Sequence, residues 1–275
     1  MLKDMARTRF ISIINILSGK VVQSYNFKKY LPIGHPKIAI DYMNNWGVDE
    51  IMLLDIKNSL TKKNFLINNL KKLTKNCQTP LAAGGGIESI KQVEKIIKTG
   101  ADKVVLNSGT LINKSLIRQS SREFGSQAVI YSLDIKKEKD RYYIYKYSGT
   151  KKIYIDILNH LKEIQEEGAG EILINSINND GSGKGFDINF LKKFKKFIHI
   201  PIILCGGYGN VNHLTKIFDL DISGFGIGNY LHHCEHSVKL IKKKIFDTHG
   251  KKFVRFDNKF NYLTHQVNSN GRLKV

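Results

Sequence analysis

The sequence is poor in several residue types, and each shortage excludes a class of protein. Of its 275 residues three are cysteine, four are proline and one is tryptophan. The cysteines, Cys77, Cys205 and Cys234, show no metal-ligand spacing, which excludes a disulfide framework and a zinc module and is typical of a reducing compartment. No run of about 18 apolar residues occurs, so no membrane-spanning helix is expected. The start, MLKDMARTRF, lacks the apolar segment of a secretory signal, and we predict a cytoplasmic protein.

Acidic residues are scarce relative to basic ones. The chain has 24 Asp and Glu against 44 Lys and Arg, which gives a formal net charge of +20. Nearly all the positive charge is lysine, in pairs spread along the whole chain. No motif of a nucleic-acid-binding family occurs, and no basic stretch with interspersed aromatic residues stands out. We therefore interpret the excess of lysine as residues on solvated helix faces, and we predict no nucleic-acid or membrane partner. Attraction of small anions is compatible with the same positive charge.

Short apolar segments alternate with helical stretches of 10–15 residues along the chain. Such alternation predicts parallel strands joined by right-handed crossovers, and eight of them close into a (β/α)8 TIM barrel, an α/β fold. We expect one barrel over residues 1–250, closed by a last helix at about 235–245, and a C-terminal tail at 251–275. The predicted strands are Ile11–Asn15, Ile51–Asp55, Leu81–Ala83, Lys103–Leu106, Ala128–Asp134, Glu171–Asn175, Ile202–Leu204 and Ser223–Ile227.

An internal repeat divides this barrel into two halves. Three pairs of segments align at one constant offset of 121 residues: GVDEIMLLDI at 47–56 with GAGEILINSI at 168–177, PLAAGGGI from Pro80 with PIILCGGY from Pro201, and ADKVVLNSG at 101–109 with ISGFGIGNY at 222–230. The first strand aligns less tightly, since Asn15 matches Asp134 at an offset of 119. The repeat predicts two fused half-barrels, at about 1–125 and 126–250.

Glycine-rich turns follow repeat-related strands of both halves. GGG at 84–86 and GG at 206–207 let backbone N–H groups approach an anion, and LNSG at 106–109 and IGNY at 227–230 can each open a helix whose N-terminus favours phosphate. In such barrels the active site lies at the carboxyl ends of the strands. We therefore predict one phosphate site in each half and a ligand phosphorylated at both ends. The alternative is that these glycines serve only tight turns.

Two polar residues, Asn15 and Asp134, end the first strands of the two halves. They are expected on opposite sides of the barrel mouth. Asp134 can act as a general acid or base if its surroundings tune its pKa. Asn15 can only donate and accept hydrogen bonds, because an amide does not exchange protons near neutral pH. The alternative for Asp134 is a capping or turn role.

These segments also carry a family resemblance. SGKVVQSYNF, GVDEIMLLDI, AAGGGI, GADKVVLNSG, FGSQAVIYSLDIK, GAGEILINSINNDGSGKGFD and PIILCGGYG, within about residues 7–250, resemble the cyclase subunit of imidazole glycerol phosphate synthase, the HisF family. The resemblance implies a lyase of histidine biosynthesis that needs no cofactor or metal. It implies a heterodimer in which a glutaminase subunit docks on the N-terminal face and releases ammonia through the barrel. The ammonia would convert a bis-phosphorylated formimino-aminoimidazole carboxamide ribonucleotide to imidazole glycerol phosphate and aminoimidazole carboxamide ribotide.

The same resemblance implies roles for individual residues. The implied phosphate-binding residues are Gly86, Asn107 and Ser108 at one site and Asp180, Gly181, Gly207, Gly228 and Asn229 at the other. The implied ammonia gate is Arg9, Glu50, Lys103 and Glu171, whose alternating charges at strand starts could close a ring. Such a ring could alternatively be purely stabilising. The chain departs from the family at its catalytic and substrate-contacting positions. Asp134 matches one catalytic aspartate, but Asn15 replaces the other. The substrate contacts Gln23 and Asn175 replace a lysine and a threonine.

Three functions follow from this pattern. The first is the histidine-pathway synthase, whose activity is in question because of Asn15. The second is a HisF-like paralogue that supplies ammonia for amidination of a surface sugar, in an O-antigen or a flagellar glycan, with altered or absent cyclase activity. The third is a non-enzymatic activator or scaffold of a glutaminase.

Overall fold

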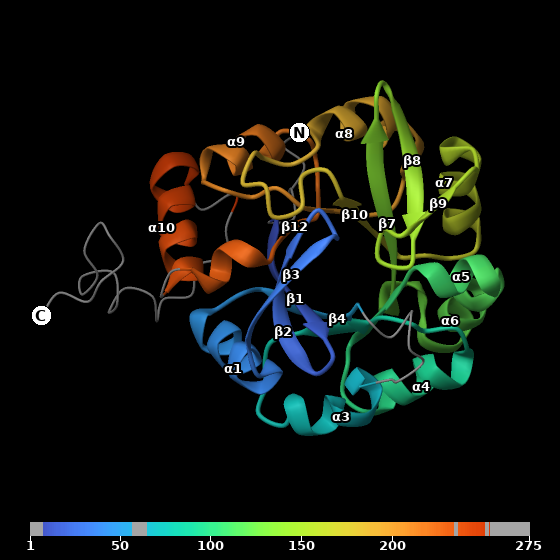
Figure 1. Cartoon of the computed structure of the whole chain (residues 1–275), viewed down its shortest axis with the longest axis horizontal. Helices are drawn as coiled ribbons and strands as arrows, with labels where there is room; N and C mark the ends of the chain where they lie inside the picture. Colours follow the sequence, from blue (N-terminus) through green and yellow to red (C-terminus); the bar gives the residue numbers. More distant parts are fainter. Residues whose placement is uncertain (1–7, 57–64, 234–235, 251–252, 254–275) are drawn as a thin grey trace, which may run out of the picture.

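A closed barrel of eight parallel strands forms the centre of the molecule. The computed structural model describes residues 8–56, 65–233, 236–250 and 253 (Figure 1). Each strand pairs with the next, and the last pairs with the first, so the predicted (β/α)8 fold is confirmed. The barrel strands are β1 (Arg9–Leu17), β4 (Glu50–Asp55), β5 (Leu81–Gly84), β6 (Lys103–Leu106), β7 (Val129–Glu138), β10 (Glu171–Ser176), β11 (Ile202–Cys205) and β12 (Gly224–Ile227). Cys234 and most of the predicted tail lie outside the described residues.

Helices surround the strands as an outer layer, as Figure 1 shows. They are α1 (Pro36–Trp46), α3 (Phe65–Leu73), α4 (Ile90–Lys98), α5 (Ser108–Ile112), α6 (Leu116–Phe124), α7 (Ile157–Glu166), α8 (Ile188–Phe194), α9 (Asn212–Phe218) and α10 (Ser237–His249), with short 3-10 turns η1 (Ser126–Ala128), η2 (Lys195–Phe197) and η3 (Asn229–His232). Local sequence sets their ends. Helix α7 starts where the Asp156 side chain accepts the N–H of Asn159, and α1 ends at Gly47, whose φ of 77° is left-handed.

The strand predictions locate all eight barrel strands, with small shifts at their ends. Ala128 was expected in a strand but closes the turn η1, because its N–H bonds to the carbonyl of Gly125. The closing helix begins at Ser237 and continues to His249, four residues beyond the expected end. None of the described helices is both long and apolar enough to cross a membrane.

The first strand of each half-barrel is followed by an antiparallel hairpin. Strand β1 leads into β2 (Lys20–Tyr25) and β3 (Lys29–Gly34), and β7 leads into β8 (Arg141–Lys146) and β9 (Lys151–Ile153). A turn at Ser18 and Gly19 opens the first hairpin, and both residues have positive φ, 51° and 79°, as a tight hairpin turn requires. The strands beyond that turn were not predicted.

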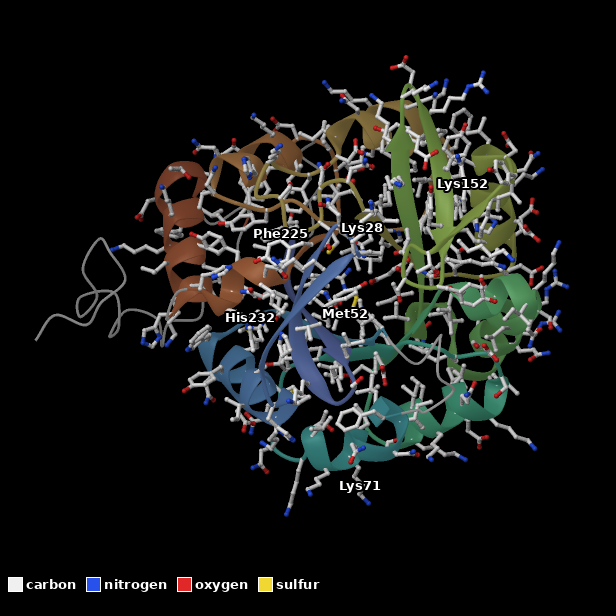
Figure 2. All side chains as sticks on the ribbon, in the orientation of Figure 1. Lys28, Met52, Lys71, Lys152, Phe225 and His232 are labelled. Atoms are coloured by element: carbon white, nitrogen blue, oxygen red, sulfur yellow. The ribbon has the colours of Figure 1, made fainter. Side chains whose placement is uncertain are left out.

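Apolar side chains fill the middle of the barrel. Alternate residues of the strands point inward and form one buried cluster: Ile11, Ile13, Met52, Ala82, Val105, Ile130, Leu173 and Ile203. Figure 2 labels Met52 near the centre of the ring of helices. On β12 the inward positions are Gly224 and Gly226, where a Cβ atom would lie 3.0 Å and 2.8 Å from the side chains of Ile11 and Ile13. The glycines therefore leave the space that these two isoleucines occupy.

Candidate functional site

Two cavities open at the carboxyl ends of the barrel strands. The first adjoins β4, β5, β6 and β7 and contains Gly86, Asn107 and Ser108 together with Asp134. The second adjoins β10, β11 and β12, and its lining includes Asp180, Gly181, Gly207, Gly228 and Asn229. The structure therefore gathers the residues of each predicted phosphate site around a cavity of their own.

Three residues line both cavities and mark the boundary between them. They are Asn15 at the end of β1, Asn175 at the end of β10, and Phe27 at the tip of the β2–β3 hairpin. A ligand with one phosphate in each cavity would pass over these side chains. The two glycine turns fit such a ligand, because Gly86 has φ 61° and a Cβ at Gly207 would lie 2.0 Å from the carbonyl oxygen of Gly185.

Asp134 is the buried carboxylate of the first cavity, with 6% of its surface exposed. It accepts hydrogen bonds from Asn107 Nδ2 at 2.8 Å and from Ser132 Oγ at 3.5 Å. Burial raises the pKa of Asp134 to about 7, although hydrogen bonds from Asn107, Ser132 and Asn175 lower it. A carboxyl group that titrates near neutral pH can both donate and accept a proton in this cavity.

Asn15 occupies the corresponding position of the other half-barrel in different surroundings. It is partly exposed, and its side chain makes no hydrogen bond within the part of the chain that the structure describes. Its amide is therefore available to a ligand between the two cavities. It offers a donor and an acceptor there, but no proton that exchanges near neutral pH.

The β2–β3 hairpin is fastened to loops of the second half-barrel. The Asp180 carboxylate accepts the hydroxyl of Ser24 at 2.6 Å and the N–H of Phe27 at 3.3 Å. The side-chain amide of Asn229 makes two hydrogen bonds to the backbone of Ser24. Its Oδ1 accepts the Ser24 N–H at 2.9 Å, and its Nδ2 donates to the Ser24 carbonyl at 2.7 Å. Burial raises the pKa of Asp180 to about 6, against the lowering effect of the bonds from Ser24 and Phe27.

Gln23 lies in this hairpin but lines neither cavity. Its side-chain nitrogen lies 3.1 Å from Nε2 of His233, and its oxygen accepts the hydroxyl of Tyr25 at 3.2 Å. Only 6% of Gln23 is exposed. In this arrangement the amide ties the hairpin to the end of η3, at a distance from the expected contact with a substrate.

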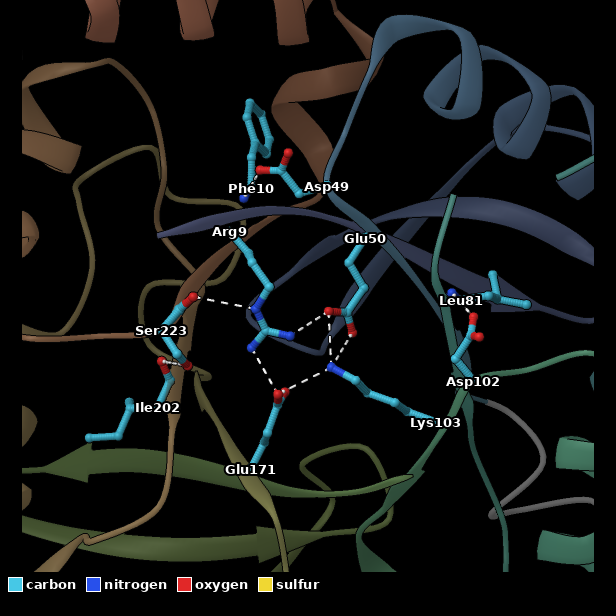
Figure 3. A network of polar contacts seen from close by, with 10 residues as sticks. All are labelled: Arg9, Phe10, Asp49, Glu50, Leu81, Asp102, Lys103, Glu171, Ile202 and Ser223. Atoms are coloured by element: carbon cyan, nitrogen blue, oxygen red, sulfur yellow. Dashed lines mark hydrogen bonds and ion pairs between the residues drawn. The ribbon is translucent and has the colours of Figure 1, made fainter. Parts of the chain in front are cut away.

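Four charged side chains close a ring at the opposite end of the barrel (Figure 3). Each is the first residue of its strand, although the predicted strands of Arg9 and Glu50 began only at Ile11 and Ile51. The four ion pairs are Arg9–Glu50 at 2.6 Å, Arg9–Glu171 at 3.0 Å, Lys103–Glu50 at 3.2 Å and Lys103–Glu171 at 3.1 Å. Burial raises the pKa of Glu50, although Lys103 and Arg9 lower it. The apolar interior of the barrel separates this ring from the two cavities.

The second hairpin shows that one conclusion from the sequence, that no basic stretch with interspersed aromatic residues stands out, was wrong. Residues 136–154, which we call the flange, hold seven Lys and Arg, two acidic residues and five tyrosines. Lysines lie over tyrosine rings, as in Lys152 at 3.6 Å from the centroid of Tyr143 and Lys136 at 5.2 Å from that of Tyr145. The chain therefore does have a basic stretch interspersed with aromatic residues, and the alternation of KKEKDRYYIYKY was its signal.

Sequence reasoning also missed residues that line the first cavity. Ser24 and Tyr30 reach it from the unpredicted first hairpin, and Ser148 from the flange. Ser132 could have been found, because it lies two residues before Asp134 on the same face of one strand. The half-buried residue Cys205 lines the second cavity, and desolvation raises the pKa of its thiol to about 12, so that the thiol stays protonated. No group of three potential metal-binding side chains occurs among the described residues.

Comparison with known proteins identifies the family. A sequence profile described as "Histidine biosynthesis protein" matches residues 9–237. The chain is 36% identical over 241 residues to imidazole glycerol phosphate synthase subunit HisF of Petrotoga mobilis, covering 86% of this chain and 95% of the relative. It is 35% identical over 244 residues to the subunit HisF of Staphylococcus epidermidis RP62A, covering 88% and 97%. The chain belongs to the HisF family.

One relative in this family matches a longer part of the chain. A Vibrio vulnificus YJ016 protein, described as "Putative imidazole glycerol phosphate synthase subunit hisF2", is 34% identical over 269 residues, 98% of each chain. The HisF relatives above leave 12–14% of this chain unmatched. The similarity to the hisF2 protein thus extends over almost the whole sequence, whereas the HisF similarity is to a shorter part.

Proposed function

We propose that this HisF-family chain is the cyclase subunit of an imidazole glycerol phosphate synthase-type amidotransferase. A glutaminase subunit docks on the face that carries the ring of Arg9, Glu50, Lys103 and Glu171. Ammonia passes this ring and the apolar barrel interior and reaches the two cavities. There it reacts with a ribonucleotide phosphorylated at both ends, and the products are imidazole glycerol phosphate and aminoimidazole carboxamide ribotide.

The observation that carries this proposal is the alignment of three parts along one barrel. The charged ring lies at the strand starts, the apolar cluster follows, and the paired cavities lie at the strand ends. Neutral ammonia crosses an apolar interior more readily than ammonium, because an unpaired charge is costly to bury. The raised pKa of Asp134, about 7, supports a role for this carboxyl group in exchanging protons with the reacting centre.

A second function is favoured by the residue at the end of β1. Asn15 stands where one of the two carboxylates is expected at the mouth, and one correctly placed proton transfer contributes about 10²–10⁴-fold to a rate. In this alternative the barrel conveys ammonia to an enzyme that amidinates a surface sugar, and it turns over the ribonucleotide slowly or not at all.

Ammonia-dependent turnover of the bis-phosphorylated ribonucleotide by the purified chain separates the two functions. The synthase function predicts turnover by the natural sequence, with no more than a small gain in Asn15→Asp. The ammonia-supply function predicts turnover near background and stimulation of the partner glutaminase. Asn15→Ala is the matched control, because it removes the amide without adding a carboxylate. Turnover that matches Asn15→Asp and vanishes in Asn15→Ala would exclude the second function.

A further inference from the structure

One chain of hydrogen bonds joins the predicted phosphate position of the first cavity to the carboxylate of Asp134. The hydroxyl of Ser108 donates to Oδ1 of Asn107 at 3.1 Å, and Nδ2 of Asn107 donates to Oδ2 of Asp134 at 2.8 Å. All three residues line the first cavity. The flange fixes the outer end of the chain, because the N–H of Tyr147 donates to Ser108 Oγ at 2.8 Å. The single hydroxyl proton of Ser108 is thus committed to Asn107.

The amide of Asn107 gives this chain a direction. An amide side chain has one acceptor end and one donor end, whereas an ionised carboxylate only accepts. The donor end of Asn107 therefore faces Asp134, and its acceptor end faces Ser108. A phosphate that arrives at Ser108 presents acceptor oxygens as well, so it meets the acceptor end of the amide.

Half a turn of the Asn107 amide about its terminal bond satisfies the phosphate. Nδ2 then donates to the phosphate, and Ser108 turns its hydroxyl toward the same ion. Oδ1 then faces Asp134, and two acceptors in contact are unfavourable unless Asp134 carries a proton that it can donate. Burial of Asp134 favours the gain of this proton, because it raises the pKa to about 7.

The charged groups around Asp134 act in the same direction. The negative charge of Asp180 raises the pKa of Asp134, and a phosphate adds further negative charge. Hydrogen bonds from Ser132 and Asn175 lower the pKa, but neither side chain bonds to Asn107 among the described residues. Further described groups that line the first cavity or interact electrostatically with Asp134 are acidic or neutral: Asp55, Tyr30, Tyr131 and Cys205.

The internal repeat supplies a comparison within the molecule. Gly228 matches Asn107 at the offset of 121 residues, and Asn15 matches Asp134 at 119. Gly228 has no side chain to connect a phosphate to the end of β1, and the amide of Asn15 exchanges no proton near neutral pH. The connection therefore occurs in the half-barrel that retains the carboxylate.

We propose that Asn107 and Ser108 form a relay that loads a proton from solvent onto Asp134 when a phosphate group occupies the first cavity. Asp134 then enters the reaction as a general acid, and it can accept a proton again once it has given this one to the substrate. One carboxyl group thereby serves as acid and base in turn, which suits a site in which Asn15 exchanges no proton. Asn107 and Ser108 are positioning residues, and the proposal rests on the proposed function for the phosphate in the cavity.

The protonation of Asp134 is measured on the full chain by 13C NMR of its carboxyl carbon, and Asp134→Asn identifies the signal. Inorganic sulfate is the probe, because it resembles a phosphate dianion but does not titrate near neutral pH. We expect the titration midpoint of Asp134 to rise by about one pH unit between chloride and saturating sulfate at matched ionic strength. A shift of this size corresponds to the loss of one hydrogen bond to a charged group.

Variants separate the relay from the charge of the ion. Asn107→Ala removes the amide, so Asp134 should titrate higher without sulfate and rise much less with it. Ser108→Ala should also raise the midpoint without sulfate, because Oδ1 of Asn107 loses its donor, and Ser108→Thr should restore the natural value. Ser148→Ala is the matched control, since Ser148 lines the same cavity but donates its hydroxyl to the carbonyl of Ile56. This control should retain the full rise.

The outcomes distinguish failure of the relay from failure of the proposed function. A rise of equal size in the natural chain and in Asn107→Ala overturns the relay and leaves the charge of the ion as its cause. An unchanged midpoint, although sulfate shifts the amide signals of Gly86 and Ser108, overturns the relay as well. If sulfate shifts neither these amide signals nor the midpoint, the phosphate site is contradicted, and with it the proposed function.

Discussion

The hairpins of the two half-barrels follow corresponding strands but lie differently. Hairpin β2–β3 crosses the mouth and places Phe27 between the two cavities, whereas β8–β9 extends beside the mouth (Figure 1). The first is held by Asp180 and Asn229, which belong to loops of the other half. The second is anchored on helix α8 through Tyr142. The partner available to each hairpin, and not its topology, decides whether it covers the site or extends it.

The strands before these hairpins, β1 and β7, also end in residues with different surroundings. Asp134 is buried and held by Asn107, whereas Asn15 is partly exposed and its amide is free of hydrogen bonds to described residues. One half-barrel therefore supplies a proton-exchanging group, and the other supplies a hydrogen-bonding group. Repeat-related positions retain their place in the barrel while their chemistry diverges.

The largest expected effect concerns the two repeat-related glutamates of the ring. Glu50→Ala should lower the free energy of unfolding by about 3–5 kcal/mol, because it leaves Arg9 and Lys103 with one shared carboxylate in a buried setting. Glu171→Ala should cost less, since that side chain is 12% exposed against 3% for Glu50, and one of its oxygens has no hydrogen-bond partner among the described residues. Urea denaturation measures both.

Glu94→Ala is the control for the ring. Glu94 pairs with Lys98 on an exposed helix face, and such a pair contributes about 0.5 kcal/mol or less. Losses of similar size in all three variants would show that the ring is not a special source of stability.

The next largest effect is expected for a variant that gives the ends of β1 and β7 the same kind of side chain, an amide. Because the pKa of Asp134 is raised to about 7 from an unfolded value near 3.9, its stabilising contribution is complete below about pH 4 and is lost as the pH rises through 7. Asp134→Asn should therefore stabilise the chain at pH 8 by about 2–4 kcal/mol, with a gain that shrinks toward pH 4. Urea denaturation at several pH values measures it. Asn15→Ala should show no such pH dependence, and a pH-independent gain in Asp134→Asn would contradict the burial argument.

The smallest effect separates the two hairpins. Asn229→Ala removes two hydrogen bonds to the Ser24 backbone, and amide exchange in β2–β3 should accelerate about 5- to 30-fold while β8–β9 stays unchanged. Tyr142→Phe is the reciprocal variant, because it removes the bond to Asp187 and should affect only β8–β9. Hydrogen exchange measured by mass spectrometry reads both hairpins in one experiment. Equal acceleration in the two hairpins would mean that they open together.

Much of the site could be predicted because it depends on position along strands. The repeat relates Asn15 to Asp134 and Glu50 to Glu171, the family resemblance adds Arg9 and Lys103, and a barrel brings strand ends together and strand starts together whatever the loops do. The hairpins could not be predicted in the same way. Their short strands are stable only through contacts with segments far away in the sequence, such as Asn229 with Ser24, 205 residues apart.

The sequence by itself determined the barrel, its two halves and the two glycine-lined turns, since all of these follow from periodicity and spacing, and the family resemblance of the sequence indicated the ring. The tertiary structure decided what the polar groups can do. Burial against Asn107 and Ser132 raises the pKa of Asp134 to about 7, contact with His233 draws Gln23 away from the cavities, and strand register places Lys136 on the face of Asp134. Desolvation and long-range hydrogen bonds depend on neighbours in space, and neighbours in space are fixed only when the chain is folded.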